Sequence, residues 1–155
     1  MLITCTINGK RITLDVPSDR RVVDILREDF GLTGTKEACG AGECGSCTIL
    51  VNGESKLSCL MVAAQLDGAD IITIEGFSPD ELHPIQEAFI EQGAIQCGFC
   101  TPGMVLAAAD LLRRIPHPSR EEIRAGISGN LCRCTGYQKI VDAIASVRLK
   151  QDNHE

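Results

Sequence analysis

Eight of the nine cysteines in this 155-residue chain fall into two groups of four. The first group has the spacing C-x4-C-x2-C-x11-C and consists of Cys39, Cys44, Cys47 and Cys59. The second group has the spacing C-x2-C-x31-C-x-C and consists of Cys97, Cys100, Cys132 and Cys134. The first spacing is typical of plant-type [2Fe–2S] sites, in which four thiolates hold two irons. Two such groups in one small chain predict two redox centres close together, which favours electron transfer over substrate chemistry.

The loop between Cys39 and Cys47 is rich in glycine, with Gly40, Gly42 and Gly45 between the cysteines. Glycine accepts positive φ angles and lacks a side chain, so the backbone of such a loop can approach cluster sulfurs closely. Its N–H groups can then donate hydrogen bonds to the sulfurs, which tunes the reduction potential of an iron–sulfur centre.

Zinc is the alternative metal for clustered cysteines. Structural zinc sites usually draw their ligands from C-x2-C pairs, and the overall x4-x2-x11 spacing of the first group does not follow that pattern. The second group combines C-x2-C with an unusual C-x-C, so its spacing alone leaves both iron–sulfur and zinc open. Each half of this group precedes an expected helix, whose N-terminal dipole and free N–H groups stabilise an anionic cluster.

Composition excludes several kinds of partner. The formal net charge is −6, whereas nucleic-acid binding requires a basic face. No apolar run approaches the roughly 18 residues of a membrane-spanning helix, and the N-terminal MLITCTINGK alternates like a strand, unlike a signal peptide. We therefore expect a cytoplasmic protein with no nucleic-acid binding and no membrane insertion. In that compartment clustered cysteines bind metal more often than they form disulfides.

The first half of the chain has the pattern of strands around one helix. Residues 2–16 alternate in polarity about an Asn8-Gly9 turn, and residues 48–58 form a second hairpin pattern about Asn52-Gly53. The ninth cysteine, Cys5, lies on the apolar face of the first strand and is expected to be a small buried hydrophobic residue. The other elements expected in this half are a helix at 22–29, a short helix at 60–65 and a last strand at 71–74.

Composition changes at a linker, residues 76–84, and the chain after it has helical patterns throughout. Thr101 is expected to be the N-cap of a central helix, because Pro102 suits the first helical position. Four helices are expected: one with an apolar stripe at Leu82, Ile85 and Phe89, one at 102–114, one opened by a capping box from Ser119 to Glu122, and one with Ile140, Ile144 and Val147.

These patterns predict an α+β chain of two domains. Residues 1–77 are expected to form a β-grasp, plant-type ferredoxin-like domain that holds the first cysteine group. Residues 78–155 are expected to form an all-α four-helix domain that holds the second group. Each domain would be small for its hydrophobic core alone, so bound metal is expected to stabilise both.

Three stretches of the chain resemble one known family. The stretch LREDFGLTGTKEACGAGECGSCTILVNG is similar to the N-terminal domain of the iron–sulfur subunit of molybdenum hydroxylases, the group of xanthine dehydrogenase, aldehyde oxidoreductase and carbon monoxide dehydrogenase. The motifs QCGFCTPGM and GNLCRCTGY resemble the second-cluster motifs of the same subunit. The resemblance covers roughly residues 2–148, and one departure is Ala38, where the family usually has glycine before the first cysteine.

The resemblance implies a second [2Fe–2S] cluster held by Cys97, Cys100, Cys132 and Cys134, nearest to a molybdopterin cofactor. It also implies that Gln96 contacts the pterin and that Cys134 lies beside the pterin amino group. The cofactor and the substrate would belong to a large subunit, and a medium subunit would bind FAD. The expected assembly is therefore a hetero-oligomer, for example a dimer of heterotrimers, in which this chain alone has no substrate-transforming site.

Two alternatives accompany this interpretation. The same relay could work without a flavin and deliver electrons to a cytochrome, since this chain would carry the same motifs. A protein of another class, a zinc-stabilised interaction module without a redox role, is the remaining alternative. The substrate and the final electron acceptor are properties of the partner subunits, so this sequence does not specify them.

Overall fold

The first half of the chain forms a five-stranded sheet in the order β2-β1-β5-β3-β4. The strands are β1 Leu2–Ile7, β2 Lys10–Asp15, β3 Thr48–Val51, β4 Glu54–Leu57 and β5 Asp70–Ile72. Strands β1 and β5 are parallel, and the other neighbours are antiparallel. Both hairpins turn where the sequence predicts, because Asn8 and Asn52 adopt φ angles of 50° and 51° and the glycine after each is also left-handed. The computed structural model describes residues 1–152, with side chains described to residue 147.

One helical segment packs against this sheet, as expected for residues 22–29. It begins as α1 Val22–Asp24 and continues as a π-helical turn, Ile25–Asp29, which the N–H of Phe30 closes on the carbonyl of Ile25 at 3.3 Å. Ile25 is fully buried against the inward side chains of β1. Cys5 lies in the same core with 3% of its surface exposed, which confirms its predicted role, and burial raises the pKa of its thiol.

Two smaller expectations for this half are wrong in detail. The predicted helix at 60–65 is two separate 3₁₀ turns, Ser58–Leu60 and Ala63–Leu66. Val62 is extended between them, with φ of −112°, because its N–H donates to the side chain of Gln65 instead of continuing a helix. The last strand ends at Ile72, two residues early, because the N–H of the next residue, Thr73, donates to the Asn8 side chain.

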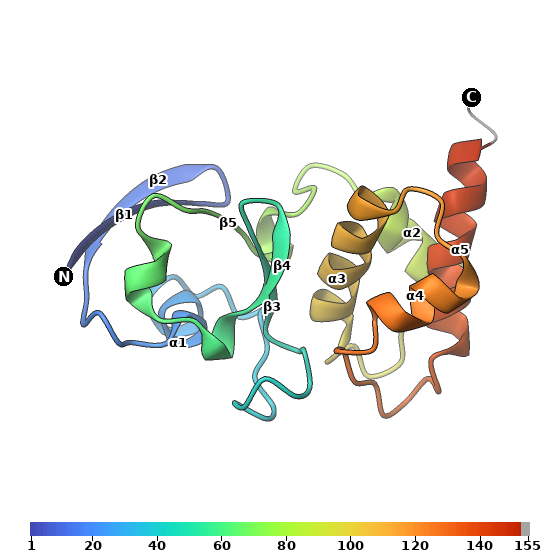
Figure 1. Ribbon diagram of the computed structural model, residues 1–155, viewed down its shortest axis with the longest axis horizontal. Helices are drawn as coiled ribbons and strands as arrows, with labels where there is room; N and C mark the ends of the chain where they lie inside the picture. The colour runs from blue at the N-terminus through green and yellow to red at the C-terminus, as the bar shows by residue number, and fades with distance from the viewer. Residues whose placement is uncertain (153–155) are drawn as a thin grey trace.

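The second half is the expected four-helix domain, with its own hydrophobic core. Its helices are α2 Pro84–Glu91, α3 Thr101–Arg114, α4 Arg120–Gly126 and α5 Gln138–Asp152. Helix α3 is the central one and lies between the sheet and the other helices (Figure 1). It is buried nearly all round, as its sequence predicts. The architecture therefore confirms the predicted fold class, a β-grasp domain followed by a helical domain, while the boundary at residues 77 and 78 stays a prediction. Within the described residues, no helix is long and apolar enough to cross a membrane.

Of three helix starts predicted from the sequence, the structure confirms one and places the other two at different residues. The capping box from Ser119 to Glu122 is present, with the Ser119 hydroxyl accepting from the Glu122 N–H at 3.1 Å. Helix α3, however, already includes Thr101, and its N-cap is Cys100, a cysteine of the second group. Leu82 lies outside α2 and is 51% exposed, because the helix begins two residues later.

The two domains also meet along α3, away from the cysteines. The carboxylate of Asp110, only 5% exposed, accepts hydrogen bonds from Ser55 in β4 at 2.9 Å and from Arg113 at 2.8 Å. Arg113 in turn donates to the carbonyl of Gly53 at 3.2 Å. Burial would raise the pKa of Asp110, but the bonds from Arg113 and Ser55 outweigh it and hold the pKa below its usual value. This contact fixes α3 on the β3–β4 hairpin.

The linker ends at His83, which caps α2. Its Nδ1 accepts the N–H of Ile85 at 3.2 Å, and its ring lies against Phe77 with ring centroids 4.8 Å apart. Nδ1 accepts a hydrogen bond only when it is unprotonated. Burial lowers the pKa of His83 and so favours that form.

We expect the first turn of α2 to lose protection as the pH falls. The folded-state pKa of His83 lies below its unfolded value, so the unfolded state takes up more protons below about pH 6.5 and the cap is progressively lost. An N-cap contributes about 1 kcal/mol. Hydrogen-exchange protection factors of α2 between pH 7.5 and 5.5 test this, with His83→Asn as control because asparagine caps without titrating. Equal pH dependence in both proteins would contradict the role of His83.

Candidate metal centres

The eight cysteines of the two groups lie on loops and turns, whereas Cys5 lies inside strand β1. The first group comes from the loop before β3 and from the 3₁₀ turn Ser58–Leu60. The second comes from the segments that precede α3 and α5. The loops before β3, α3 and α5 all reach the same edge of the molecule, the lower edge in Figure 1. The sequence thus places two separate donor sets side by side on two different scaffolds.

Cys39 lies in a cradle of backbone N–H groups. Its sulfur accepts from Ala41 and Glu43 at 3.3 Å each and from Cys44 at 3.4 Å. The three glycines of this loop have the left-handed φ angles that their positions suggested, between 62° and 78°. The bonds from Ala41, Cys44 and Glu43 lower the pKa of Cys39 to about 6. A sulfur held in this way is a ready thiolate ligand, because the thiolate is the metal-binding form.

The four sulfurs of the first group occur as two pairs. Cys39 and Cys44 form one pair, since the backbone N–H of Cys44 donates to the sulfur of Cys39 and both this N–H and the Cys44 side chain lower the pKa of Cys39. Cys47 and Cys59 form the other and are 2% and 5% exposed. Burial, followed by the hydrogen bond to Cys47, raises the pKa of Cys59 to about 11, and the charge of Cys39 also raises it. The pairs are therefore close enough to influence each other.

In the second group, Cys132 is the best-supported sulfur. It accepts hydrogen bonds from the hydroxyl of Thr135 at 3.1 Å and from its N–H at 3.4 Å. Burial would raise the pKa of Cys132, but the bonds from Thr135 outweigh it and lower the pKa. Its partner Cys100 is the N-cap of α3, and burial together with the hydrogen bond to Cys132 raises the pKa of Cys100 to about 12.

The other two cysteines of this group lie at its rim. Cys97 accepts the N–H of Phe99 at 3.5 Å and lies near enough for its charge to raise the pKa of Cys100. Cys134 is exposed, and its backbone N–H donates to the sulfur of Cys132. The structure therefore brings all four cysteines of the second group into one neighbourhood.

The donor sets fit binuclear clusters. A structural zinc needs four donors on one ion, whereas a [2Fe–2S] cluster divides four thiolates between two irons. The pairing in the first group, and the Cys100–Cys132 pair in the second, match the latter arrangement.

The structure also reveals supporting residues that sequence reasoning missed. Ser46 places its hydroxyl 3.2 Å from the sulfur of Cys44. Tyr137 accepts the N–H of Cys132 on its hydroxyl at 2.9 Å, and Thr135 supports the sulfur of the same cysteine. Each lies within three residues of a cysteine in a recognised motif, Tyr137 being three residues after Cys134. Only their proximity to the motifs could have indicated them, because the geometry depends on how the loops fold.

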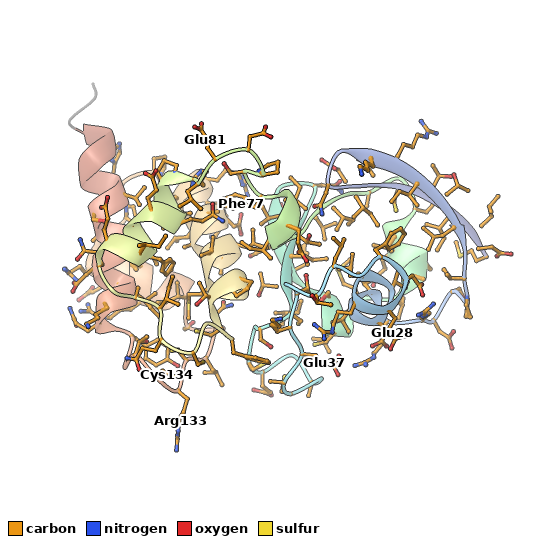
Figure 2. All side chains as sticks on the ribbon, turned by 180° about the vertical axis from the view of Figure 1, so that it is seen from behind. Glu28, Glu37, Phe77, Glu81, Arg133 and Cys134 are labelled. Carbon is orange, nitrogen blue, oxygen red and sulfur yellow. The ribbon has the colours of Figure 1, made fainter. Side chains whose placement is uncertain are left out.

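The two residues predicted to contact a pterin, Gln96 and Cys134, are both exposed. They come from different loops, before α3 and α5, at the edge where the cysteine loops lie. Arg133, between two cysteines of the second group, is also exposed, and it projects away from the body of the protein next to Cys134 (Figure 2). An exposed position is compatible with contact to a cofactor held by another chain, and the roles of Gln96 and Cys134 stay predictions.

Comparison with known proteins matches the two halves of the chain to two different family models. Residues 5–72 match the family model of the 2Fe-2S iron-sulfur cluster binding domain. Residues 73–145 match that of the [2Fe-2S] binding domain. Among curated proteins, the nicotinate dehydrogenase small FeS subunit of Eubacterium barkeri is 49% identical over 143 residues, which cover 92% of this chain and 91% of the relative. The nicotine 6-hydroxylase small subunit of Paenarthrobacter nicotinovorans is 49% identical over 142 residues, 92% of this chain and 86% of the relative.

Solved structures agree with these matches. In quinoline 2-oxidoreductase from Pseudomonas putida 86, a chain that is 47% identical superposes with a TM-score of 0.92, covering 100% of this chain and 98% of that one. The aldehyde oxidoreductase from Desulfovibrio gigas superposes with a TM-score of 0.93 at 38% identity, but there the match covers 100% of this chain and only 18% of the other. The chain therefore belongs to the iron–sulfur small subunits of the molybdenum hydroxylases, a family of oxidoreductase subunits built from two [2Fe–2S] domains.

Proposed function

We propose that this chain is the electron-transfer subunit of a molybdenum-dependent hydroxylase or dehydrogenase. In the proposed complex, a large subunit binds the molybdopterin cofactor and the substrate, and a medium subunit binds FAD. Electrons pass one at a time from the molybdopterin centre through the helical domain, then through the β-grasp domain, to FAD. Substrate oxidation releases two electrons together, whereas each cluster accepts one, so two one-electron centres in series suit the task.

Each cysteine group is proposed to hold one [2Fe–2S] cluster. The first-cluster ligands are Cys39, Cys44, Cys47 and Cys59, and the second-cluster ligands are Cys97, Cys100, Cys132 and Cys134. The sulfur pairs and the N–H donors to Cys39 and Cys132 support this assignment. With the domain boundary between residues 77 and 78, each cluster has a scaffold of its own.

A direct hydrogen bond between the two cysteine loops carries the proposal. The N–H of Leu131 donates to the carbonyl oxygen of Cys44 at 2.8 Å. Leu131 immediately precedes Cys132, so a few covalent bonds and one hydrogen bond connect a proposed ligand of one cluster with a proposed ligand of the other. A short bonded route of this kind supports one-electron transfer between the two centres.

The surface around the second group supports docking of a large partner. Ile95, Phe99 and Leu131 flank these cysteines and are 39%, 43% and 54% exposed. Exposed apolar side chains that gather at one place mark interaction sites. The first group has its own exposed cysteine, Cys39, on the other domain, which suits a second partner. We propose a cytoplasmic hetero-oligomer, for example a dimer of heterotrimers.

Gln96→Ala is expected to leave both clusters in place and to slow turnover of the assembled complex about tenfold. That is the effect of losing one hydrogen bond of about 1.4 kcal/mol to a cofactor. Iron content and the visible spectrum report the clusters, and molybdenum content reports cofactor seating. Gln92→Ala is a matched control, because Gln92 is an exposed glutamine at the end of α2. Unchanged turnover and molybdenum content in Gln96→Ala would remove Gln96 from the site.

The proposed function is tested by purifying the native complex through a tag on this chain and measuring molybdenum, iron and flavin. Molybdenum, flavin and about four irons per small chain are the expected result, since two [2Fe–2S] clusters hold four irons. If the complex contains molybdenum and a cytochrome but no flavin, the electrons leave this chain for the cytochrome, and the flavin-free relay is the correct alternative. Iron without molybdenum would overturn the proposed partners and leave a two-cluster electron carrier with another donor.

A further inference from the structure

The two cysteine loops touch through a small set of residues, Gly45, Gly103 and Asn130, which we call the glycine–asparagine seam. Gly45 lies between Cys44 and Cys47 in the first group. Asn130 lies two residues before Cys132, and its side chain is buried, with 7% of its surface exposed. Its Nδ2 donates to the carbonyl of Gly45 at 3.0 Å and reaches the hydroxyl of Thr48 at 3.3 Å. The hydroxyl of Thr48 donates to the same carbonyl at 2.7 Å.

The seam leaves no room for a side chain at either glycine. A Cβ atom added to Gly103 would lie 2.4 Å from the carbonyl oxygen of Gly45. A Cβ added to Gly45 would lie 2.3 Å from the carbonyl oxygen of Gly129 and 2.7 Å from the Asn130 amide nitrogen. Because these neighbours are backbone or buried groups, a methyl group would push the loops apart.

The seam and the contact of Asp110 lie at different places in the interface between the two domains. Asp110 lies seven residues after Gly103 on α3, about 10 Å along the helix at 1.5 Å per residue. That contact fixes the helix on the β3–β4 hairpin. The seam instead joins the loops that carry the cysteines, because Asn130 lies two residues before Cys132 and bonds to Gly45, the residue after Cys44. The Leu131 bond lies directly beside it.

We propose that Asn130 is a positioning residue that sets the separation and relative orientation of the two clusters. This inference rests on the ligand assignment of the proposed function. The hydrogen bond from the Asn130 amide holds the Gly45 carbonyl against the loop that leads to Cys132. Because Gly103 has no side chain, the two backbones can approach closely enough for this bond to form. Replacing the amide by a carboxylate removes the donor and places a charged oxygen in a buried site opposite the Gly45 carbonyl oxygen, which keeps its bond from Thr48. Repulsion between the two oxygens then favours separation of the loops.

Two variants and one control test the seam. Asn130→Asp keeps the size of the side chain but removes the donor. Gly103→Ala adds the methyl group that meets Gly45, although alanine is the better helix former. Gly129→Ala is the control, because it is exposed, is one residue from Asn130, and has no atom within 4 Å of an added Cβ.

The measurement is the electron paramagnetic resonance spectrum of the full chain with both clusters reduced, since magnetic coupling between two centres falls steeply with their separation. We expect a splitting in the wild type and in Gly129→Ala. Both seam variants should retain the iron content and the visible spectrum but lose or narrow the splitting.

Several results would overturn the role of Asn130. An unchanged splitting in Asn130→Asp would do so even if Gly103→Ala fails to fold, and so would a wild type that holds two clusters without any splitting. Loss of a whole cluster in Asn130→Asp would assign the residue to cluster assembly instead of positioning. A wild-type chain that binds fewer than two clusters would be a failure of the proposed ligand assignment itself, which is a different result.

Discussion

Replacing Cys44 with serine is expected to remove one of the two clusters completely. A [2Fe–2S] cluster needs four thiolates, and a serine hydroxyl stays protonated where a cysteine in this loop can ionise. The substitution changes only the side chain, so the backbone N–H of residue 44 can still donate to the sulfur of Cys39 and its carbonyl can still accept from Leu131. Iron should fall from about four to about two per chain, and the signals of the first cluster should disappear while those of the second remain.

The chain offers a matched control in its ninth cysteine. Cys5 lies in the core of the sheet, belongs to neither group and should tolerate Cys5→Ala with both clusters intact. In the assembled complex, Cys44→Ser should also block electron exit while the partner subunit still binds substrate. A full visible spectrum in Cys44→Ser, or loss of a cluster in Cys5→Ala, would contradict the ligand assignment.

The features that the sequence predicted correctly depend on neighbouring residues. Two Asn-Gly turns, the capping box at Ser119 and the burial of Cys5 each follow from a few adjacent side chains, and each is present. The three glycines between Cys39 and Cys47 also have the left-handed φ angles that their positions suggested, whereas the ligand role of the cysteines stays a prediction. The resemblance to a known family added the second group, for which spacing alone left zinc open.

The features that were missed depend on contacts between distant segments. Asn130 is buried only because Gly45, 85 residues earlier in the chain, lies against it. Asp110 is likewise satisfied by Ser55 from the other domain. One missed feature is local: Val62 interrupts an apparently helical stretch because the side chain of Gln65, three residues later, accepts its N–H. Hydrophobic periodicity in a sequence does not indicate which polar residues of two domains will meet, because these contacts form only when the domains pack together.

Removing iron is expected to destabilise the β-grasp domain strongly. Its cysteine loop has no strand or helix between the π-helical turn and β3. Single hydrogen bonds and the ion pair of Arg21 with Glu37 hold it instead. Arg27 donates to the carbonyls of Thr33 and Thr35, and the N–H of Lys36 donates to the carbonyl of Ser46. The small apolar cluster beneath the loop consists largely of the proposed ligands themselves, because it joins Val23 to Cys47 and Cys59.

A ligand present at a thousand times its Kd stabilises the folded state by about 4 kcal/mol. For a domain of this size such a loss corresponds to roughly 15 °C or more in Tm. Calorimetry of the reduced apo-protein against the cluster-loaded chain measures the effect, and rebuilding the clusters with iron and sulfide should restore the original Tm. An apo-protein with unchanged melting behaviour would show that the loop is held by the protein alone.

The two domains should respond differently to this treatment. The helical domain buries a broad apolar core that includes Phe89, Met104 and Ile144, none of which touches iron in the proposed arrangement. Its helices should therefore keep most of their hydrogen-exchange protection in the apo-protein, whereas the segment from Lys36 to Ser46 should exchange freely. Because Asn130 ties that segment to the helical domain at Gly45, residual protection near Gly45 alone would indicate that the seam forms before the clusters are inserted. Uniform loss of protection across both domains would instead mean that they unfold as one cooperative unit.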